Sequence, residues 1–208
     1  MYNRIIIVDD RIGDKSLFSK IEKTYTIEDN QIKESSVCEN DNVSHSDICV
    51  KIILKYAPDV KIINVVVKGN WEVGKIDDFI LALDLCRHID ADLVSMSLGT
   101  TKRKKLNKMK KLVKDITKHK IVVASKSNDM KKTYPAAFNN VMECYYKDKK
   151  RFVNDCEFTN ESIKNELYIR DNRGKLCILP YCNSYLTAHI SGIVFKELET
   201  TNNDFGKN

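Results

Sequence analysis

The hydrophobic positions of this chain follow two different periods along its length. Short apolar runs rich in Ile and Val alternate with stretches in which apolar residues recur every three or four positions. The apolar runs predict strands at residues 4–9, 61–67, 92–97, 120–124 and 141–146. The helical spacing predicts helices over residues 45–56, 76–88, 102–120 and 184–198.

This alternation predicts the fold class. A strand, a helix and a parallel strand form a right-handed crossover, and successive crossovers build a parallel sheet with helices on both faces. We therefore predict a three-layer α/β/α fold with a mainly parallel central sheet, formed by a single domain over residues 1–199. A disordered tail is expected over 200–208, an acidic loop over 27–44 and a hairpin turn at 172–174.

Composition narrows the class of protein. The 208 residues are 42% hydrophobic and 31% charged, which is typical of a folded globular chain. No apolar run approaches the roughly 20 residues that cross a bilayer, and the N-terminus lacks the apolar segment of a signal peptide. Seven scattered cysteines without a Cys-x-x-Cys motif favour reduced thiols. We expect a cytoplasmic protein with no membrane partner.

The net charge of +6 is unevenly distributed. Residues 102–120 carry ten Lys or Arg against one Asp, whereas residues 1–50 carry six against ten acidic residues. Apolar residues at helical spacing run through the basic segment, so it is interpreted as a surface helix with a solvated cationic face. No helix-turn-helix, zinc or aromatic stacking pattern accompanies it, and no nucleic-acid partner is predicted.

Polar residues stand where three predicted strands end. Asp9 and Asp10 follow the first strand, residues 97–99 a middle one and residues 125–128 the next. In open parallel sheets, functional groups gather beyond the carboxyl ends of the strands. The segment "IIIVDD" also resembles the start of a response-regulator receiver domain, but "DLVSMSLG" lacks the phosphoacceptor aspartate that such a domain needs. No metal and no cofactor are predicted.

One of the four histidines suits a catalytic role. His189 follows Ser184 by five residues, which places it about 140° around the predicted helix and out of reach of that hydroxyl. His88 and His119 lie near helix C-termini, where a cation complements the helix dipole. His45 instead begins a helix after a polar loop, so it can project from the edge of the sheet that carries the polar strand ends.

An aspartate, a histidine and a serine thus follow the chain order of subtilisin triads. Six segments carry a fuller resemblance: "IIIVDDRI", "SHSDICVKII", "YAPDVKIINVVV", "ADLVSMSLG", "IVVASKSNDM" with "TYPAAFNNV", and "NSYLTAHISG". In order and spacing they are similar to the motifs of subtilisin-like serine peptidases, over residues from about 4 to 198. The resemblance implies a subtilisin-like fold.

It also implies the roles of individual residues. Asp9, His45 and Ser184 take the places of the catalytic triad, in which the base activates the serine and the acid orients the base. Asn128 takes the place of the side chain that stabilises the oxyanion. A peptide or protein substrate would then add as an extended strand along the three residues Ser97, Leu98 and Gly99.

Some motif positions differ from the family pattern. Lys126 stands in a stretch where relatives have small residues, and it predicts an acidic or small P1 side chain in the substrate. Four residues close to the triad stand where the family has glycine: Ser46, Ser127, Cys182 and Arg11. Tyr185 and Ala188 stand where the family has methionine and proline.

Two functions follow from these motifs. The first is an active serine endopeptidase of narrow specificity that processes a precursor or leader peptide. Because no inhibitory propeptide is expected before Met1, narrow specificity or a regulatory partner protein would have to limit its activity. The second is a catalytically weak or inactive relative that binds peptides or serves as a partner subunit.

Overall fold

A computed structural model describes residues 3–37, 39, 43–67, 76–161, 163, 167–170, 176–179 and 181–205. Its strands are β1 (Arg4–Asp9), β2 (Ile21–Glu28), β3 (Gln31–Ser35), β4 (Lys61–Val67), β5 (Leu93–Met96), β6 (Ile121–Ser125), β7 (Met142–Lys147), β8 (Lys150–Val153), β9 (Cys156–Glu157), β10 (Leu167–Arg170) and β11 (Leu176–Leu179). The helices are the short 3-10 helix η1 (Lys15–Lys20) and the α-helices α1 (His45–Leu54), α2 (Ile76–His88), α3 (Leu106–Ile116) and α4 (Asn183–Phe205).

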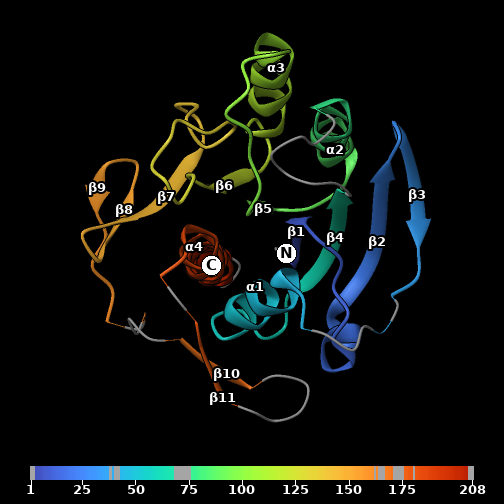
Figure 1. The fold of residues 1–208 in the computed structure, drawn as a ribbon. Helices are drawn as coiled ribbons and strands as arrows, with labels where there is room; N and C mark the ends of the chain where they lie inside the picture. Colours follow the sequence, from blue (N-terminus) through green and yellow to red (C-terminus); the bar gives the residue numbers. More distant parts are fainter. Residues whose placement is uncertain are drawn as a thin grey trace.

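Nine of these strands form one sheet in the order β3-β2-β4-β1-β5-β6-β7-β8-β9 (Figure 1). The six inner strands, which in sheet order are β2, β4, β1, β5, β6 and β7, pair in parallel. Strands β3, β8 and β9 are antiparallel additions at the two edges, and β10 and β11 form a separate antiparallel pair. The predicted mainly parallel sheet is therefore confirmed.

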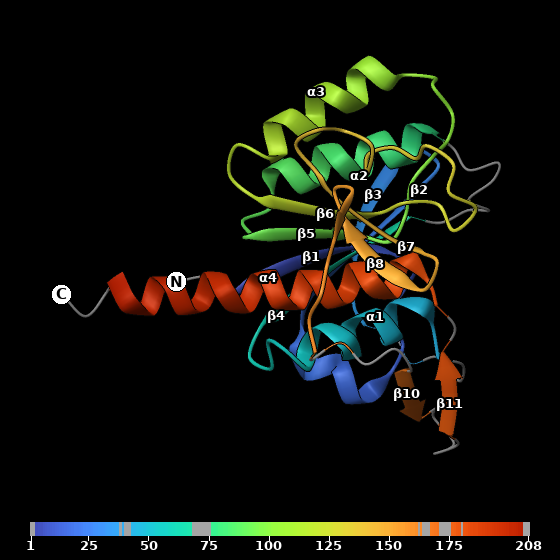
Figure 2. The ribbon, with the colours of Figure 1, turned by 90° about the vertical axis from the view of Figure 1, so that its left-hand side faces the viewer.

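Helices cover both faces of the sheet, with α1 and α4 on one side and α2 and α3 on the other (Figures 1 and 2). Packing on both faces explains why the sequence of the central strand β1 is apolar without interruption. Ile6 and Val8 pack toward α2 and α3, whereas Ile5 and Ile7 pack toward α1 and α4. Successive strand residues point to opposite faces, so a strand buried on both sides needs apolar residues at every position.

The long helix α4 packs closely against α1. A Cβ atom at Gly192 would lie 2.8 Å from the Tyr56 ring and 3.0 Å from the Ile53 carbonyl oxygen, so only glycine permits this approach. The helix begins at Asn183, one residue before its predicted start, and it continues to Phe205. Residues 200–205, expected in a disordered tail, are therefore helical, and Figure 2 shows the C-terminal turns extending beyond the sheet.

The acidic loop predicted over residues 27–44 is wrong in its first part. Strands β2 and β3 form a hairpin there, with Asp29 and Asn30 at its turn. Both turn residues have positive φ, 52° and 58°, a conformation that Asp and Asn tolerate better than most residues. The fully buried Ile27 anchors the hairpin to the core. The other predicted turn, at 172–174, lies outside the described residues.

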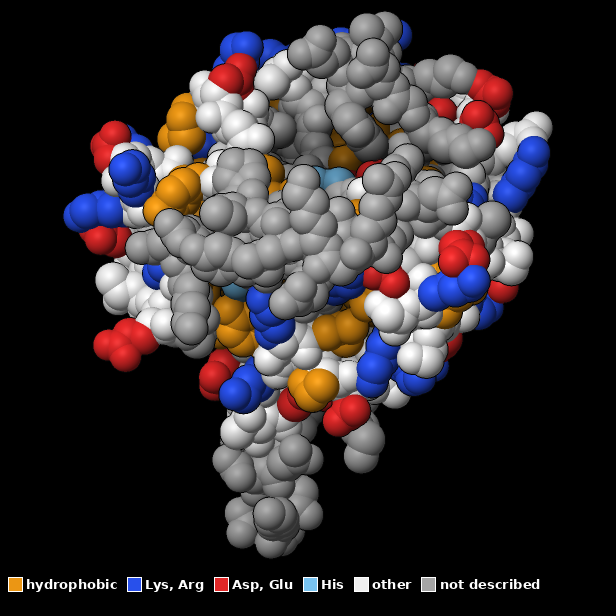
Figure 3. All heavy atoms as spheres, turned by 60° about the horizontal axis from the view of Figure 1, so that its bottom comes forward, with side chains coloured by type: hydrophobic (Ala, Val, Ile, Leu, Met, Phe, Trp, Pro, Cys, Tyr) orange, Lys and Arg blue, Asp and Glu red, His pale blue; other side chains and the backbone are white. Residues whose placement is uncertain are grey.

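The basic segment forms the amphipathic helix that its pattern predicts. Met109, Leu112, Val113 and Ile116 of α3 are buried against α2, and the lysines point outward. On the opposite face, seen in Figure 3, positively and negatively charged side chains are mixed around the rim. Among the helices in the described ranges, none combines the length and apolar character needed to cross a membrane.

Substitution of Phe195 measures how far stability depends on the packing of α4 against α1 and the sheet. Its side chain is fully buried among the residues between α4, α1 and the sheet. Phe195→Ala is expected to lower the free energy of unfolding by about 3–5 kcal/mol, because it removes the burial and leaves a cavity. Urea denaturation measures this change. The neighbouring exposed Lys196→Ala is the control, expected to stay within about 0.5 kcal/mol of wild type; equal effects of both variants would contradict the prediction.

Candidate active site

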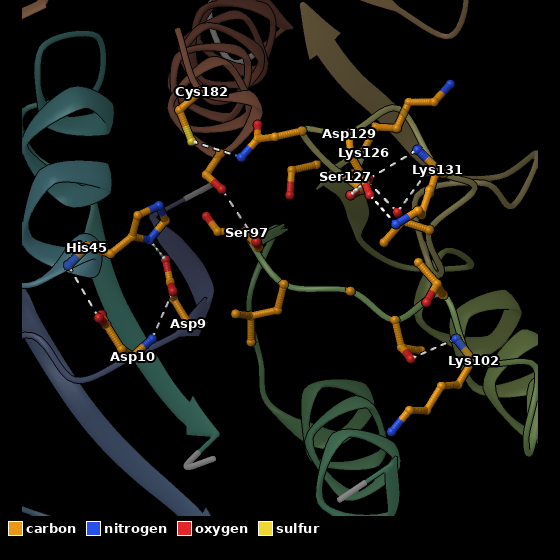
Figure 4. Close-up of a pocket in the computed structure, with 18 residues that line it drawn as sticks. Asp9, Asp10, His45, Ser97, Lys102, Lys126, Ser127, Asp129, Lys131 and Cys182 are labelled. Carbon is orange, nitrogen blue, oxygen red and sulfur yellow. Dashed lines mark hydrogen bonds and ion pairs between the residues drawn. The ribbon is translucent and has the colours of Figure 1, made fainter. Parts of the chain in front are cut away.

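A pocket of about 610 Å³ opens at the carboxyl ends of the central strands, beside the N-termini of α1 and α4 (Figure 4). Its lining includes the eight residues to which the motifs assign a role in catalysis or substrate binding: Asp9, His45, Ser97, Leu98, Gly99, Lys126, Asn128 and Ser184. Folding therefore brings together segments that are up to 175 positions apart in the chain (Asp9 to Ser184).

An aspartate and a histidine form the tightest pair in the pocket. Oδ2 of Asp9, at the end of β1, lies 2.7 Å from Nδ1 of His45, the first residue of α1. Asp9 is 3% exposed, and its other oxygen accepts a hydrogen bond from the Asp10 N–H at 2.9 Å. Burial opposes protonation of His45, but hydrogen bonds with Asp9, Cys182 and Cys49 outweigh it and raise the pKa of His45. Asp9 therefore fixes the ring orientation and stabilises the imidazolium.

Two carboxylates hold the start of α1 in place. Asp10 accepts hydrogen bonds from the His45 N–H at 3.3 Å and from the Ser46 N–H at 2.8 Å. Ser44 is the N-cap, and it forms a capping box with Asp47. These side chains bond N–H groups that a helix leaves unpaired in its first turn, where negative charge is also favoured by the helix dipole. They fix the position from which the imidazole projects.

The serine that replaces a family glycine after His45 is accommodated by the structure. The Ser46 side chain is fully buried, and its hydroxyl donates to the Asp10 carbonyl oxygen at 2.8 Å. The same oxygen accepts from the Asn64 side chain at 3.1 Å. The substitution thus adds a hydrogen bond between α1 and the segment after β1.

Ser184 lies in the first turn of α4 and is 9% exposed. Its hydroxyl donates to the Ser97 carbonyl oxygen at 3.5 Å, the long limit of a hydrogen bond. The hydrogen bonds assigned within the described ranges do not join it to His45. The thiol of Cys182 lies nearby, 3.8 Å from the Asn128 side-chain nitrogen (Figure 4). The Ser184 hydroxyl therefore points toward the end of β5 in this arrangement.

Asn183, which the sequence reasoning missed, ties the start of α4 to the sheet. Its backbone N–H donates to the Asn128 side-chain oxygen at 3.0 Å. Its side chain donates to the carbonyls of Lys126 and Ser127 at 3.0 and 3.1 Å and accepts from the Tyr146 N–H at 2.8 Å. A polar residue directly before a helical serine was the available signal. Its four partners come from distant segments and could not be inferred.

His45 and His189 each contact a tyrosine, and the two contacts indicate different roles. Tyr185 stacks on His45 with ring centroids 5.4 Å apart, and burial raises the pKa of Tyr185 to about 12, so it remains neutral. His189 instead contacts the Tyr56 hydroxyl through Nδ1 at 2.7 Å. Burial and the charges of Lys55 and Arg151 lower the pKa of His189 to about 4. His189 is a neutral packing residue, in agreement with the helical geometry that kept it from Ser184.

Lys126 lines the pocket but does not present an isolated charge. Its Nζ lies 3.3 Å from the Glu143 carboxylate and 4.3 Å from the centre of the Tyr145 ring. Both members of the ion pair are mostly buried, with side-chain exposures of 17% and 13%. An acidic substrate group would therefore compete with Glu143 for this ammonium.

One group of potential metal ligands occurs among the described residues. Ligand atoms of Asp9, His45 and Cys49 lie within 4.8 Å of one another. The 2.7 Å contact between Asp9 and His45 is shorter than the separation of about 3.3 Å between two ligands on one tetrahedral zinc ion. Burial also raises the pKa of Cys49, whereas a metal-binding cysteine must be a thiolate. This geometry fits a direct hydrogen bond better than a metal site.

The sequence matches no protein-family model and no curated protein. The structure is similar to that of the nisin leader peptidase NisP from Lactococcus lactis, with a TM-score of 0.71, 13% identity, and coverage of 96% of this chain and 78% of that one. A lanthipeptide protease gives a TM-score of 0.67 and 13% identity over 96% and 75% of the two chains. The epidermin leader peptide processing serine protease EpiP from Staphylococcus aureus gives 0.68 and 12% over 97% and 66%.

At sequence identities of 12–13%, the similarity to these structures shows a shared fold only. The three-layer arrangement and the mainly parallel nine-stranded sheet match these subtilisin-like structures, as the motifs predicted.

Asp47 provides a test of how the site is positioned. Its carboxylate accepts from the N–H groups of Gly13, Asp14 and Ser44 at 2.9, 3.0 and 2.8 Å. Asp47→Ala leaves these three donors without this acceptor, and we expect a loss of at least about 2 kcal/mol in the free energy of unfolding. Asp47→Asn keeps one acceptor oxygen and should lose less. Urea denaturation of both variants measures this order; an equal or smaller loss in Asp47→Ala would contradict the prediction.

Proposed function

We propose that this protein is a serine endopeptidase that cleaves a precursor or leader peptide. The observation that carries the proposal is the 2.7 Å contact between Asp9 and His45 in a pocket that also contains Ser184 and Asn128. Similarity in fold to peptidases described as acting on leader peptides supports this substrate class.

In the proposed reaction, Ser184 Oγ turns from the Ser97 carbonyl toward His45 and loses its proton to the imidazole as it attacks the substrate carbonyl carbon. Asp9 stabilises the resulting imidazolium. The imidazolium then gives the proton to the leaving amine as the C–N bond breaks. Water releases the acyl group from Ser184 by the same steps in reverse.

The negative oxygen of the tetrahedral intermediate needs hydrogen-bond donors that are already in position. The Asn128 side-chain nitrogen and the Ser184 backbone N–H are the proposed donors, at the positive end of α4. Asn183 supports this role, because its N–H holds the Asn128 oxygen at 3.0 Å and so turns the amide nitrogen toward the pocket. Removing such a donor lowers kcat by about 10²–10³.

The substrate is proposed to bind as an extended strand along Ser97, Leu98 and Gly99, which line the pocket after β5. Gly99 lies close to its neighbours: a Cβ atom there would approach the Thr133 methyl group and lie 2.9 Å from the Tyr134 carbonyl oxygen. A cytoplasmic location and control by a partner protein remain predictions from the sequence.

A second function, peptide binding without catalysis, is favoured by one specific observation. Ser184 donates to the Ser97 carbonyl instead of to His45, and Cys182 occupies a position where the family has glycine. A protein of this kind would keep the substrate strand site and lack turnover.

Labelling with a fluorophosphonate separates the two functions, since this probe reacts with an activated serine. The wild-type protein is expected to be labelled, and Ser184→Ala and His45→Ala are each expected to lose the label, as read by intact-protein mass spectrometry. Ser191→Ala is the matched serine control, because Ser191 lies on the same helix but bonds Ser95 at 2.9 Å within the core. A folded wild-type protein that takes no label would favour the binding function.

The lining position of Lys126 predicts cleavage after acidic or small side chains. Digestion of a peptide library should give Asp, Glu or small residues at P1. Lys126→Gln should weaken the preference for acidic P1 residues roughly fivefold, the value of about 1 kcal/mol for one ion pair. Lys108→Gln, an exposed position on α3, should leave the preference unchanged. Large apolar residues at P1 in the wild-type digest would refute this specificity.

A further inference from the structure

Cys182 occupies the N-cap position of α4. Its carbonyl oxygen accepts the first hydrogen bonds of the helix, from the N–H groups of Tyr185 at 3.0 Å and Leu186 at 3.1 Å. Side chains at this position face the unpaired N–H groups of the first turn. The N–H groups of Ser184 and Tyr185 stabilise negative charge on the Cys182 sulfur. A neutral thiol is a weak acceptor, so this environment stabilises a thiolate.

The same sulfur also faces the base and the amide of the pocket. The Asn128 side-chain nitrogen lies 3.8 Å from it, and it lines the same pocket as the His45 imidazole (Figure 4). Burial opposes ionisation of Cys182, but its interactions with His45, with the N–H and the hydroxyl of Ser184 and with the Tyr185 N–H lower its pKa to about 7. Because the pKa of His45 is raised, the pair favours transfer of the proton from sulfur to imidazole.

We propose that Cys182 is a second nucleophile of this pocket and that His45 serves it ahead of Ser184. This inference rests on the proposed peptidase function and concerns which atom attacks the substrate. Its basis is the position of the sulfur, which lines the pocket beside the imidazole while the Ser184 hydroxyl bonds to Ser97.

The other cysteines with described side chains do not meet these conditions. Cys49 lies 3.9 Å from His45 Nδ1, the nitrogen already bonded to Asp9, and its side chain is 1% exposed. Cys86 and Cys144 are fully buried, and burial raises the pKa of both thiols. Cys156 is exposed on β9, outside the pocket lining. Within this set, Cys182 alone combines access to the pocket with a histidine.

The proposed step needs no reactant besides the peptide and water. The Cys182 thiolate attacks the acyl carbon, a C–S bond forms, and the carbonyl electron pair moves to oxygen near the Asn128 amide. As the intermediate collapses, the C–N bond breaks and the amine takes the proton from the His45 imidazolium. Water then attacks the thioester while His45 accepts its proton; the C–S bond breaks, and the thiolate and a carboxylic acid are released.

Alkylation rates test the pairing of Cys182 with His45. Each thiol is followed by peptide mass mapping after timed reaction with iodoacetamide between pH 5 and pH 9. The Cys182 rate should rise with a midpoint near pH 7, and His45→Gln should lower that rate about tenfold at pH 6.5. Cys156 in the same molecules is the internal control, and His45→Gln should not change its rate. Equal rates for the two thiols, unaffected by His45→Gln, would overturn the inference.

Acyl transfer identifies the attacking atom directly. The probe is p-nitrophenyl acetate, and the acylated residue is located by mass mapping, with neutral hydroxylamine to release a thioester. We expect acetyl on Cys182 in the wild-type protein and in Ser184→Ala, and its loss in Cys182→Ala. Cys182→Ser, which keeps a good N-cap residue, serves in its place if the alanine variant does not fold.

The outcomes distinguish this inference from the proposed function. Acylation and fluorophosphonate labelling confined to Ser184, retained or increased in Cys182→Gly, would overturn the role of Cys182 and leave the serine peptidase standing. Acylation of Cys182 with peptide cleavage that survives in Ser184→Ala would support the inference. A folded wild-type protein with neither residue acylated would overturn both.

Discussion

The site depends on the attachment of two helix N-termini to the carboxyl edge of one parallel sheet. Asp10 and Asp47 bind N–H groups at the start of α1, and Asn183 joins the start of α4 to the ends of β6 and β7. All three side chains are wholly or largely buried and use their hydrogen-bonding capacity across segments. Unpaired polar groups inside a protein are costly, so these bonds fix the two helices relative to the strands. The imidazole and the two candidate nucleophiles are positioned as a result.

The central part of the fold could be predicted from the sequence because its signals are local. Strands β1 and β4 and helix α2 have the predicted boundaries, since each apolar pattern ends at charged or polar residues. Strand β3 could not be found in this way. Four of its five residues are exposed, and its conformation depends on pairing with β2. Edge strands β8 and β9 were missed for a similar reason: none of their residues is fully buried.

The candidate site was predictable as a set of residues but not as a set of contacts. Motif order led to Asp9, His45 and Ser184, and all three line one pocket. The orientation of the Ser184 hydroxyl and the partners of Asn183 depend on segments that meet only in three dimensions. The sequence also marked Cys182 merely as a missing glycine. The position of the Cys182 sulfur in the pocket, beside Asn128, is seen only in the structure.

Three of the glycine replacements near the site have different physical consequences. Ser46 gains a buried hydrogen bond to the Asp10 carbonyl, and the Ser127 hydroxyl bonds the Asp129 carboxylate. Both serine hydroxyls therefore form hydrogen bonds with nearby residues. Cys182 instead introduces an ionisable group at the start of α4, in the pocket that also holds the imidazole.

The order of the elements along the chain has a consequence for biosynthesis. The acid and the base lie within the first 45 residues, whereas Cys182 and Ser184 arrive with α4, which must insert against α1 and the sheet to complete the core. A nascent chain that has emerged only through β9 lacks the part of the pocket lining that Cys182 and Ser184 form. The pocket is therefore completed only when the last helix packs against α1 and the sheet.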